Sequence, residues 1–318
     1  MKDNKKGIIL SIAIFSLIII IGILLFIRHS SSVDHETEST PSEEAIDKNW
    51  QLANDVHTPT LSHAQSTEDK QEMETFSKQY NDQIQSPSVA DIAKSYAKDH
   101  QSPEDSLDDL MVDLPTIDTN DDHYILVNKL NPLKTEPNVT LTSTANGEQY
   151  AADIKSEVDQ LVSDAQSAGY SLVFISGHRT IAYQKQNREN GYQSYLAAGY
   201  SIEEAEQLTD TYYAPAEASE HSTGLALDLL DSQWMQQGGS LNEDYASHPS
   251  AQWLADHAAD YGFILRYPKG KEKITGYSFE PWHFRYVGKD VAKYIHRHHL
   301  TFEEFLALAN YKNKLHNQ

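Results

Sequence analysis

The chain has 318 residues, a formal net charge of −22 at pH 7 and no cysteine. This length is enough for one sizeable domain with appendages. The acidic balance argues against nucleic-acid binding, which requires basic surfaces, and the absence of cysteine excludes disulfides and a lipid-modified N-terminal cysteine.

The first element in chain order is an uncharged apolar stretch over residues 7–27. Its 21 residues are enough to span a bilayer as a helix. Lys2, Lys5 and Lys6 precede it, which by the positive-inside rule places residues 1–6 in the cytoplasm as a short tail. A cleaved signal peptide would have a shorter apolar region and a small-residue cleavage site. We therefore expect a single-pass protein of the cell membrane whose remaining chain is extracellular.

Residues 28–118 are strongly acidic. From Ser30 to Asp118 there are 20 acidic residues against five lysines, with few long apolar runs. Such a composition is typical of a solvated tether rather than of a second core. A short helix is indicated only where Ser88 and Asp91 precede a few apolar residues. We expect a mostly flexible extracellular linker over residues 28–118.

The pattern over residues 119–318 predicts one compact α+β domain. Apolar residues recur at helical spacing over 153–168 and 250–261, and capping boxes at 201–204 and 301–304 indicate two more helices. Short alternating or wholly apolar runs between the helices indicate strands. We expect a small antiparallel sheet that carries the functional site, with helices flanking it.

Two of the predicted strands carry polar side chains on the face opposite their apolar residues. Asp228 lies on a leucine-rich strand, with His221 seven residues before it. His283 lies on an aromatic strand, with Glu280 three residues before it. Two imidazoles and one carboxylate form the three-ligand set of a catalytic zinc, which keeps a fourth position for water. Glu280, at an irregular strand start, is then a candidate proton acceptor.

A structural role is the alternative for each of these residues. A lone histidine or strand aspartate is more often structural, but a buried Asp228 requires a partner that offsets its desolvation. His257 shares a helix face with Trp253, which indicates packing. The remaining histidine cluster lies near a helix C-terminus without a carboxylate at ligand spacing, so we do not expect a metal there: it comprises His296, His298 and His299.

Three runs of sequence resemble the VanY-type D-alanyl-D-alanine carboxypeptidases, a group that includes the LdcB/DacB-type L,D-carboxypeptidases. The runs are residues 262–271, 275–277 and 280–288, and the resemblance extends from about residue 124 to about residue 306. It implies a zinc peptidase that acts on peptidoglycan. It further implies that Zn²⁺ is bound by His221, Asp228 and His283 and that Glu280 is the catalytic base.

The resemblance also implies a substrate-binding set. Arg179, Gln184 and Ser219 would hold the terminal carboxylate or the scissile carbonyl of the substrate, and Arg179 would also stabilise the oxyanion. A planar guanidinium pairs bidentately with a carboxylate, which a carboxypeptidase must recognise. The chain departs from the usual pattern at three positions near the cleft, which leaves substrate preference open: His178, Ala218 and Ser222.

The implied function is removal of the terminal D-alanine from peptidoglycan stem peptides, as a D,D- or L,D-carboxypeptidase. Two alternatives are an endopeptidase that cuts crosslinks and a non-catalytic, zinc-containing wall-binding module. An arginine directed at a free carboxylate argues against the first, and the presence of Glu280 argues against the second. The choice between tetrapeptide and pentapeptide stems, and the oligomeric state, are not determined by these residues.

Overall fold

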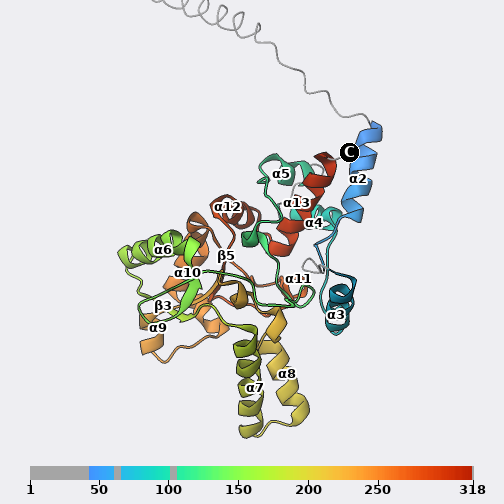
Figure 1. The fold of residues 1–318 in the computed structure, drawn as a ribbon. Coiled ribbons are helices and arrows are strands. Elements are labelled where there is room, and N and C mark those ends of the chain that lie inside the picture. Colours follow the sequence, from blue (N-terminus) through green and yellow to red (C-terminus); the bar gives the residue numbers. More distant parts are fainter. Residues whose placement is uncertain (1–42, 61–65, 101–105, 317–318) are drawn as a thin grey trace, which may run out of the picture. The chain divides into compact units, whose positions relative to one another are not determined.

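The computed structural model describes residues 43–60, 66–100 and 106–316 (Figure 1). Residues from Lys48 onward form one unit. The expected transmembrane segment 7–27 lies outside the described residues. Within the described ranges, no helix is both long and apolar enough to cross a membrane.

A four-stranded antiparallel sheet forms the centre of this unit. Its strand order is β3-β4-β6-β5, with β3 (Leu172–Ser176), β4 (Ala226–Asp231), β5 (Phe263–Leu265) and β6 (His283–Tyr286). A separate hairpin pairs β1 (Leu141–Ser143) with β2 (Gln149–Ala151). The expected α+β class and small antiparallel sheet are confirmed.

Within residues 119–316, helices follow and separate the strands. In chain order they are α6 (Lys155–Ser167), α7 (Ile181–Ala197), α8 (Ile202–Tyr212), α9 (Ser232–Gln236), α10 (Pro249–His257), α11 (Glu272–Thr275), α12 (Lys289–His298) and α13 (Phe302–His316). Short 3-10 turns are η1 (Asp122–Tyr124), η2 (Ala152–Ile154), η3 (Ala216–Ala218), η4 (Glu220–Thr223), η5 (Glu243–Ser247) and η6 (Ala258–Tyr261).

One face of the sheet packs against α6, α10 and η6. Leu227 and Phe284 are cross-strand partners on β4 and β6, and both are fully buried in this core with Leu161 of α6 and Leu254 of α10. The alternation of β4 and β6 therefore buries leucine and aromatic side chains together. The neighbouring positions on both strands carry polar side chains on the opposite face of the sheet.

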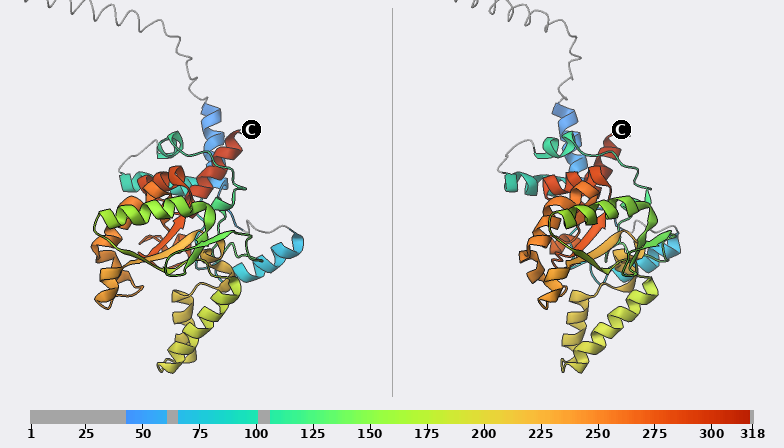
Figure 2. Two further views of the ribbon diagram at one scale, coloured as in Figure 1. Left: turned by 60° about the vertical axis from the view of Figure 1, so that its left-hand side comes forward. Right: turned by 90° about the vertical axis from the view of Figure 1, so that its left-hand side faces the viewer.

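Helices α7 and α8 form a hairpin that extends away from the sheet (Figures 1 and 2). The capping box at Ser201 and Glu204 starts α8, as expected from the sequence. Gly191 of α7 lies against the ring of Tyr213, where an added Cβ would come within 2.5 Å. Arg188 of α7 pairs with Asp210 of α8, which holds the two helices together.

The segment expected to be a flexible linker is instead helical where it is described. It contains α2 (Glu43–Asp55), α3 (Thr67–Ser77), α4 (Val89–His100) and α5 (Ser106–Val112). Val89, Ile92 and Leu110 are at most 1% exposed and join a core with α12 and α13. The flexible-linker prediction was therefore wrong for this part of the chain, apart from the short helix indicated at Ser88 and Asp91, which is α4. A narrow apolar stripe on α2, α4 and α5 is sufficient for docking even when the remaining surface is acidic.

Candidate active site

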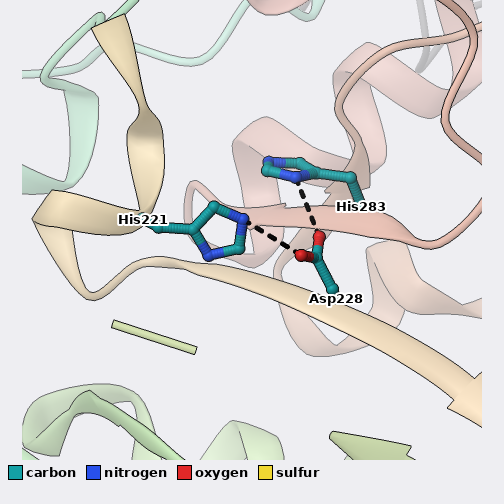
Figure 3. A group of neighbouring side chains, drawn as sticks. All are labelled: His221, Asp228 and His283. Carbon is teal, nitrogen blue, oxygen red and sulfur yellow. Dashed lines mark ion pairs between the residues drawn. The ribbon is translucent and has the colours of Figure 1, made fainter. Parts of the chain in front are cut away.

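Three potential metal ligands meet at the polar face of the sheet (Figure 3). Asp228 on β4 and His283 on β6 are direct cross-strand partners, so the sheet itself sets their separation. His221 comes from the turn η4, which Gly224 ends in a left-handed conformation with φ 72°. An added Cβ at Gly224 would lie 3.1 Å from the Ala151 nitrogen, so glycine suits this turn.

The geometry of the three residues fits a metal ion. One candidate ligand atom from each lies within 4.8 Å of the others, with His221 Nε2 3.3 Å from Asp228 Oδ2 and His283 Nδ1 3.1 Å from Asp228 Oδ1. All three side chains are buried, and His221 Nε2 and Asp228 Oδ1 have no hydrogen-bond partner. Buried polar atoms without partners are costly. Two imidazoles and a carboxylate at this spacing are suited to Zn²⁺. Among the described residues, this is the one cluster of three or more such side chains that could hold a metal.

The tautomers of both histidines are set by their second nitrogen atoms. His221 Nδ1 lies 2.7 Å from the carbonyl oxygen of Gly177, so an Nδ1–H donates there and Nε2 keeps its lone pair for a metal. His283 directs Nδ1 toward Asp228, while its Nε2 lies 3.6 Å from Glu220 Oε2. Neither His283 Nε2 nor Glu220 Oε2 has another partner. A carboxylate behind a histidine ligand orients the ring and raises its basicity.

Glu220 is held in place by two fully buried arginines. Arg266 Nε lies 2.7 Å and Arg285 Nη1 2.9 Å from Glu220 Oε1. Arg266 also donates two hydrogen bonds to Glu303 at the start of α13. We call Glu220, Arg266, Arg285 and Glu303 the buried ion network. No role is expected for these four residues from the sequence, although Arg266 and Arg285 lie within the runs that carry the resemblance and Glu220 directly precedes His221.

The charges at the site shift the pKa values of the ligands in different directions. Burial, together with the Arg179 guanidinium, lowers the pKa of His221 to about 4, so this ring is neutral at pH 7. Burial alone would lower the pKa of His283, but the neighbouring carboxylates of Asp228 and Glu220 raise it to about 9. Burial would raise the pKa of Asp228, but the two histidines hold it well below its usual range. A metal ion held by this set would require His283 to give up its proton at neutral pH.

Glu280 lies beside the ligand set, as the irregular start of β6 suggested. Its Oε2 is 3.6 Å from His283 Nδ1, and its side chain is 18% exposed to the cavity. Burial raises the pKa of Glu280 to about 7, with His283 opposing and Asp228 adding to the shift. A carboxyl group with a pKa near neutrality is suited to general-base catalysis.

The three residues expected to bind substrate line the same cavity of about 580 Å³ as the ligands and Glu280. Arg179 Nη1 lies 2.9 Å from Ser176 Oγ and 3.7 Å from Asp228 Oδ2, and its Nε has no partner. Gln184 uses its Nε2 to bond the Ala214 carbonyl, which leaves Oε1 without a partner. The Ser219 Oγ is buried and also without a partner. Polar atoms from all three are thus available to a ligand.

Further walls of the cavity come from residues without an expected role. Tyr195, Tyr212 and Tyr213 line it from the α7/α8 hairpin, and residues 241–244 and Trp282 line other parts. Long-range packing places the tyrosines and residues 241–244 near the metal ligands, and no local motif marks them, whereas Trp282 directly precedes His283 in one of the quoted runs. Of the departures from the motif, Ser222 donates a hydrogen bond to the Arg179 carbonyl and so supports the turn that carries the guanidinium.

Two other histidines that the structure describes, His257 and His298, make contacts outside this cluster. His257 stacks on Trp253 with ring centroids 4.7 Å apart, and it bonds the Trp253 carbonyl. His298 lies near the end of α12, with Nε2 3.1 Å from Asp113 Oδ1. These contacts agree with the structural roles expected for both.

Comparisons with known proteins identify the group to which this site belongs. The family model described as "VanY: D-alanyl-D-alanine carboxypeptidase" matches residues 147–289. A D-alanyl-D-alanine carboxypeptidase of Enterococcus faecalis is 36% identical over 57% of this chain and 65% of the relative. The bifunctional D-Ala-D-Ala dipeptidase and D-Ala-D-Ala carboxypeptidase VanXYC of Enterococcus gallinarum is 31% identical over 57% of this chain and 91% of the relative.

A solved structure of a VanY enzyme is also similar to this chain. A mutant of the vancomycin resistance D,D-pentapeptidase VanY from the VanB-type resistance cassette, in complex with Zn(II), superposes with a TM-score of 0.52 and 33% identity. The match covers 58% of this chain and 99% of that chain. The chain spans less than two-thirds of the length of the Enterococcus faecalis relative. Together with the zinc-compatible cluster, these matches show that the chain belongs to the VanY family of D-alanyl-D-alanine carboxypeptidases.

Proposed function

We propose that this protein is a zinc-dependent carboxypeptidase that removes the terminal D-alanine from peptidoglycan stem peptides. One observation carries the proposal: the Glu280 carboxylate faces a buried, zinc-compatible set of His221, Asp228 and His283 in the same cavity as Arg179. A base beside a metal set supports hydrolysis, and a cation in the same cavity supports recognition of a free carboxylate. The names of the relatives support D-alanine as the leaving residue.

The residues divide the chemistry between them. A zinc ion at this set would polarise the scissile carbonyl and lower the pKa of a water molecule there from about 15.7 to about 7. Glu280 is placed to accept the proton of the attacking water and to pass it to the leaving amine. Its pKa of about 7 permits both transfers near neutral pH. Burial of the ligands keeps bulk water from competing for these groups.

Arg179, Gln184 and Ser219 are proposed to hold the C-terminal residue of the substrate. The unpartnered Arg179 Nε, Gln184 Oε1 and Ser219 Oγ offer donors and acceptors in residues that line the same cavity as the metal set. Arg179 can pair with a terminal carboxylate, or with the oxyanion that develops at the scissile carbonyl. An endopeptidase has no terminal carboxylate to pair at this position, and a binding module has no use for Glu280 as a base.

Membrane anchoring is a separate part of the proposal. The 21 uncharged apolar residues 7–27, with three lysines before them, support an N-terminal anchor with a cytoplasmic tail. The catalytic unit would then act on wall peptides outside the cell. Protease added to intact cells should remove the catalytic unit and leave only a short anchored fragment; full protection of the chain would contradict this orientation.

The activity is tested by mass spectrometry of defined tri-, tetra- and pentapeptide stems after incubation with the zinc-loaded protein. We expect loss of one D-alanine from the pentapeptide, the tetrapeptide or both, which assigns D,D- or L,D-specificity. Arg179→Ala should weaken turnover of free-acid peptides by about 2–4 kcal/mol in transition-state terms and that of C-terminal amides much less. Cleavage of crosslinked dimers without release of D-alanine would contradict the carboxypeptidase assignment.

A further inference from the structure

Lys129 is a buried cation that forms no ion pair with any residue that the structure describes. It is only 7% exposed, and it lies in the segment between η1 and β1. Its Nζ lies 4.8 Å from the ring centroid of Tyr277 and 5.4 Å from that of Tyr80. Among the described residues, no carboxylate lies within ion-pair distance of Nζ and no hydrogen bond of the ammonium is formed. Two aromatic faces offset part of the desolvation of an ammonium, but a buried charge ordinarily also has an ionic partner.

Lys129 lines a second cavity, of about 290 Å³. This cavity and the reaction cavity share two wall residues, Tyr277 and Ser278, which immediately precede the segment that carries Glu280. A peptide that places its C-terminal residue at Arg179 can therefore extend past Ser278 toward Lys129. A substrate bound in this direction would place its amino-terminal part in the second cavity.

The other charged groups of the second cavity do not neutralise Lys129. Asp210 pairs with Arg188, and Glu272 accepts a hydrogen bond from the Gly270 nitrogen at an exposed position. Lys273, the remaining charged wall residue, adds a second cation. Burial lowers the pKa of Lys129, while the more distant Asp210 and Glu280 oppose this shift. An anion bound in this cavity would remove the imbalance.

We propose that Lys129 binds a carboxylate of the substrate on the amino-terminal side of the scissile bond. This inference rests on the proposed carboxypeptidase function. It defines the substrate as a D-alanine-terminated peptide with an acidic residue upstream, in addition to its free C-terminus. Tyr80 and Tyr277 would flank the ion pair and limit its access to water, which strengthens a charge-assisted hydrogen bond.

The test uses pairs of D-alanine-terminated peptides. The two members of a pair differ at one upstream position, where one carries a free acid and the other a carboxamide, and a separate pair is made for each upstream position. The full-length protein should bind one acid peptide on the order of 10- to 100-fold more tightly than its amide, and Lys129→Met should abolish this preference. For the acid peptide, we expect Lys129→Met to raise KM and to leave kcat nearly unchanged. Lys129→Arg should retain part of the preference, and Lys273→Met, in the same cavity, should retain most of it.

Binding of the shortened product peptides to the zinc-free protein, measured by calorimetry, separates this inference from the proposed function. If no peptide loses D-alanine but the acid preference in binding depends on Lys129, the proposed function fails and the subsite stands. Equal binding of every acid–amide pair by the unmodified protein would overturn the subsite even if Lys129→Met does not fold. The same conclusion would follow if Lys129→Met weakened binding of acids and amides equally.

Discussion

Two buried polar regions lie side by side in this protein and differ in how their hydrogen bonds are satisfied. In the buried ion network, Arg266 and Arg285 use every side-chain nitrogen, on Glu220, Glu303 and backbone carbonyls. In the ligand set, His221 Nε2 and Asp228 Oδ1 have no hydrogen-bond partner although their residues are equally buried. Burial and polarity alone therefore do not mark the active site.

This difference in hydrogen bonding distinguishes the structural region from the region that binds a ligand. A satisfied network is stable as it stands, whereas atoms without partners have a cost that only a bound group removes. Glu220 joins the two regions, since its Oε1 belongs to the network and its Oε2 faces His283. Substitutions in the two regions should therefore affect different measurements.

The largest effect is expected at Glu280. Glu280→Gln keeps size and hydrogen bonding but cannot accept a proton, so turnover should fall by about 10²–10⁴-fold while zinc content stays normal. His283→Ala should lose zinc and activity together. Zinc content by mass spectrometry and D-alanine release from one stem peptide check both variants. Near-normal turnover by Glu280→Gln, or loss of its zinc, would show that its role is not that of a base.

The next largest effect is expected on the free energy of unfolding, when the buried ion network is disrupted. Arg266→Met removes a fully buried cation and leaves Glu220 and Glu303 as buried carboxylates with fewer partners. The free energy of unfolding should fall by roughly 3–5 kcal/mol, measured by denaturant titration. Lys293→Met breaks the exposed pair with Asp260 and should cost less than about 1 kcal/mol. Similar losses in the two variants would contradict the structural role of the network.

Some of this organisation could be predicted from the sequence. The strand alternation around Asp228 and His283 is a local pattern, and so are the capping boxes at Ser201 and Thr301, whose reciprocal bonds are present. The pairing of Arg266 with Glu220, 46 residues away, leaves no local pattern. Such contacts depend on how distant segments pack.

The helices before residue 119 show a second limit of prediction from the sequence. An average over an acidic segment hides a narrow apolar stripe, and this stripe, with Val89 and Ile92, is what joins the core. Lys129 is similar, because a lysine in the sequence gives no sign that it will be buried between two tyrosines.

The pH dependence of stability provides a further test of the active-site region, through the Glu280 carboxyl group. Burial raises the pKa of Glu280 from its ordinary 4.5 to about 7, so the folded protein binds more protons than the unfolded chain between these values. The contribution of Glu280 to the free energy of unfolding is thus lost as pH rises from 4.5 to 7, by about 3 kcal/mol.

The check is to compare Glu280→Gln with the unmodified protein after zinc is removed by chelation. The two should have similar stability at pH 4.5, and the variant should be more stable at pH 8, because a neutral amide carries no desolvated charge. A stability difference that does not change with pH would contradict the raised pKa.

The smallest effect is expected on zinc affinity, when Glu220, which joins the two regions, is substituted. Glu220→Gln keeps the shape of the side chain but weakens its hold on His283 Nε2 and on both arginines. Zinc affinity should fall by about 10- to 100-fold, as is typical for the loss of a carboxylate behind a histidine ligand. Competition with a chromogenic chelator measures it. Glu204→Gln, at the exposed capping box of α8, is a matched control and should leave zinc affinity unchanged.

Zinc stoichiometry tests the central claim most directly, since the account depends on His221, Asp228 and His283 forming one metal site. The purified full-length protein should contain one zinc ion per chain, and His221→Ala/His283→Ala should contain none while its helical circular dichroism is retained. Zinc retained in full by the double variant, or an unmodified protein that binds no zinc, would contradict the account.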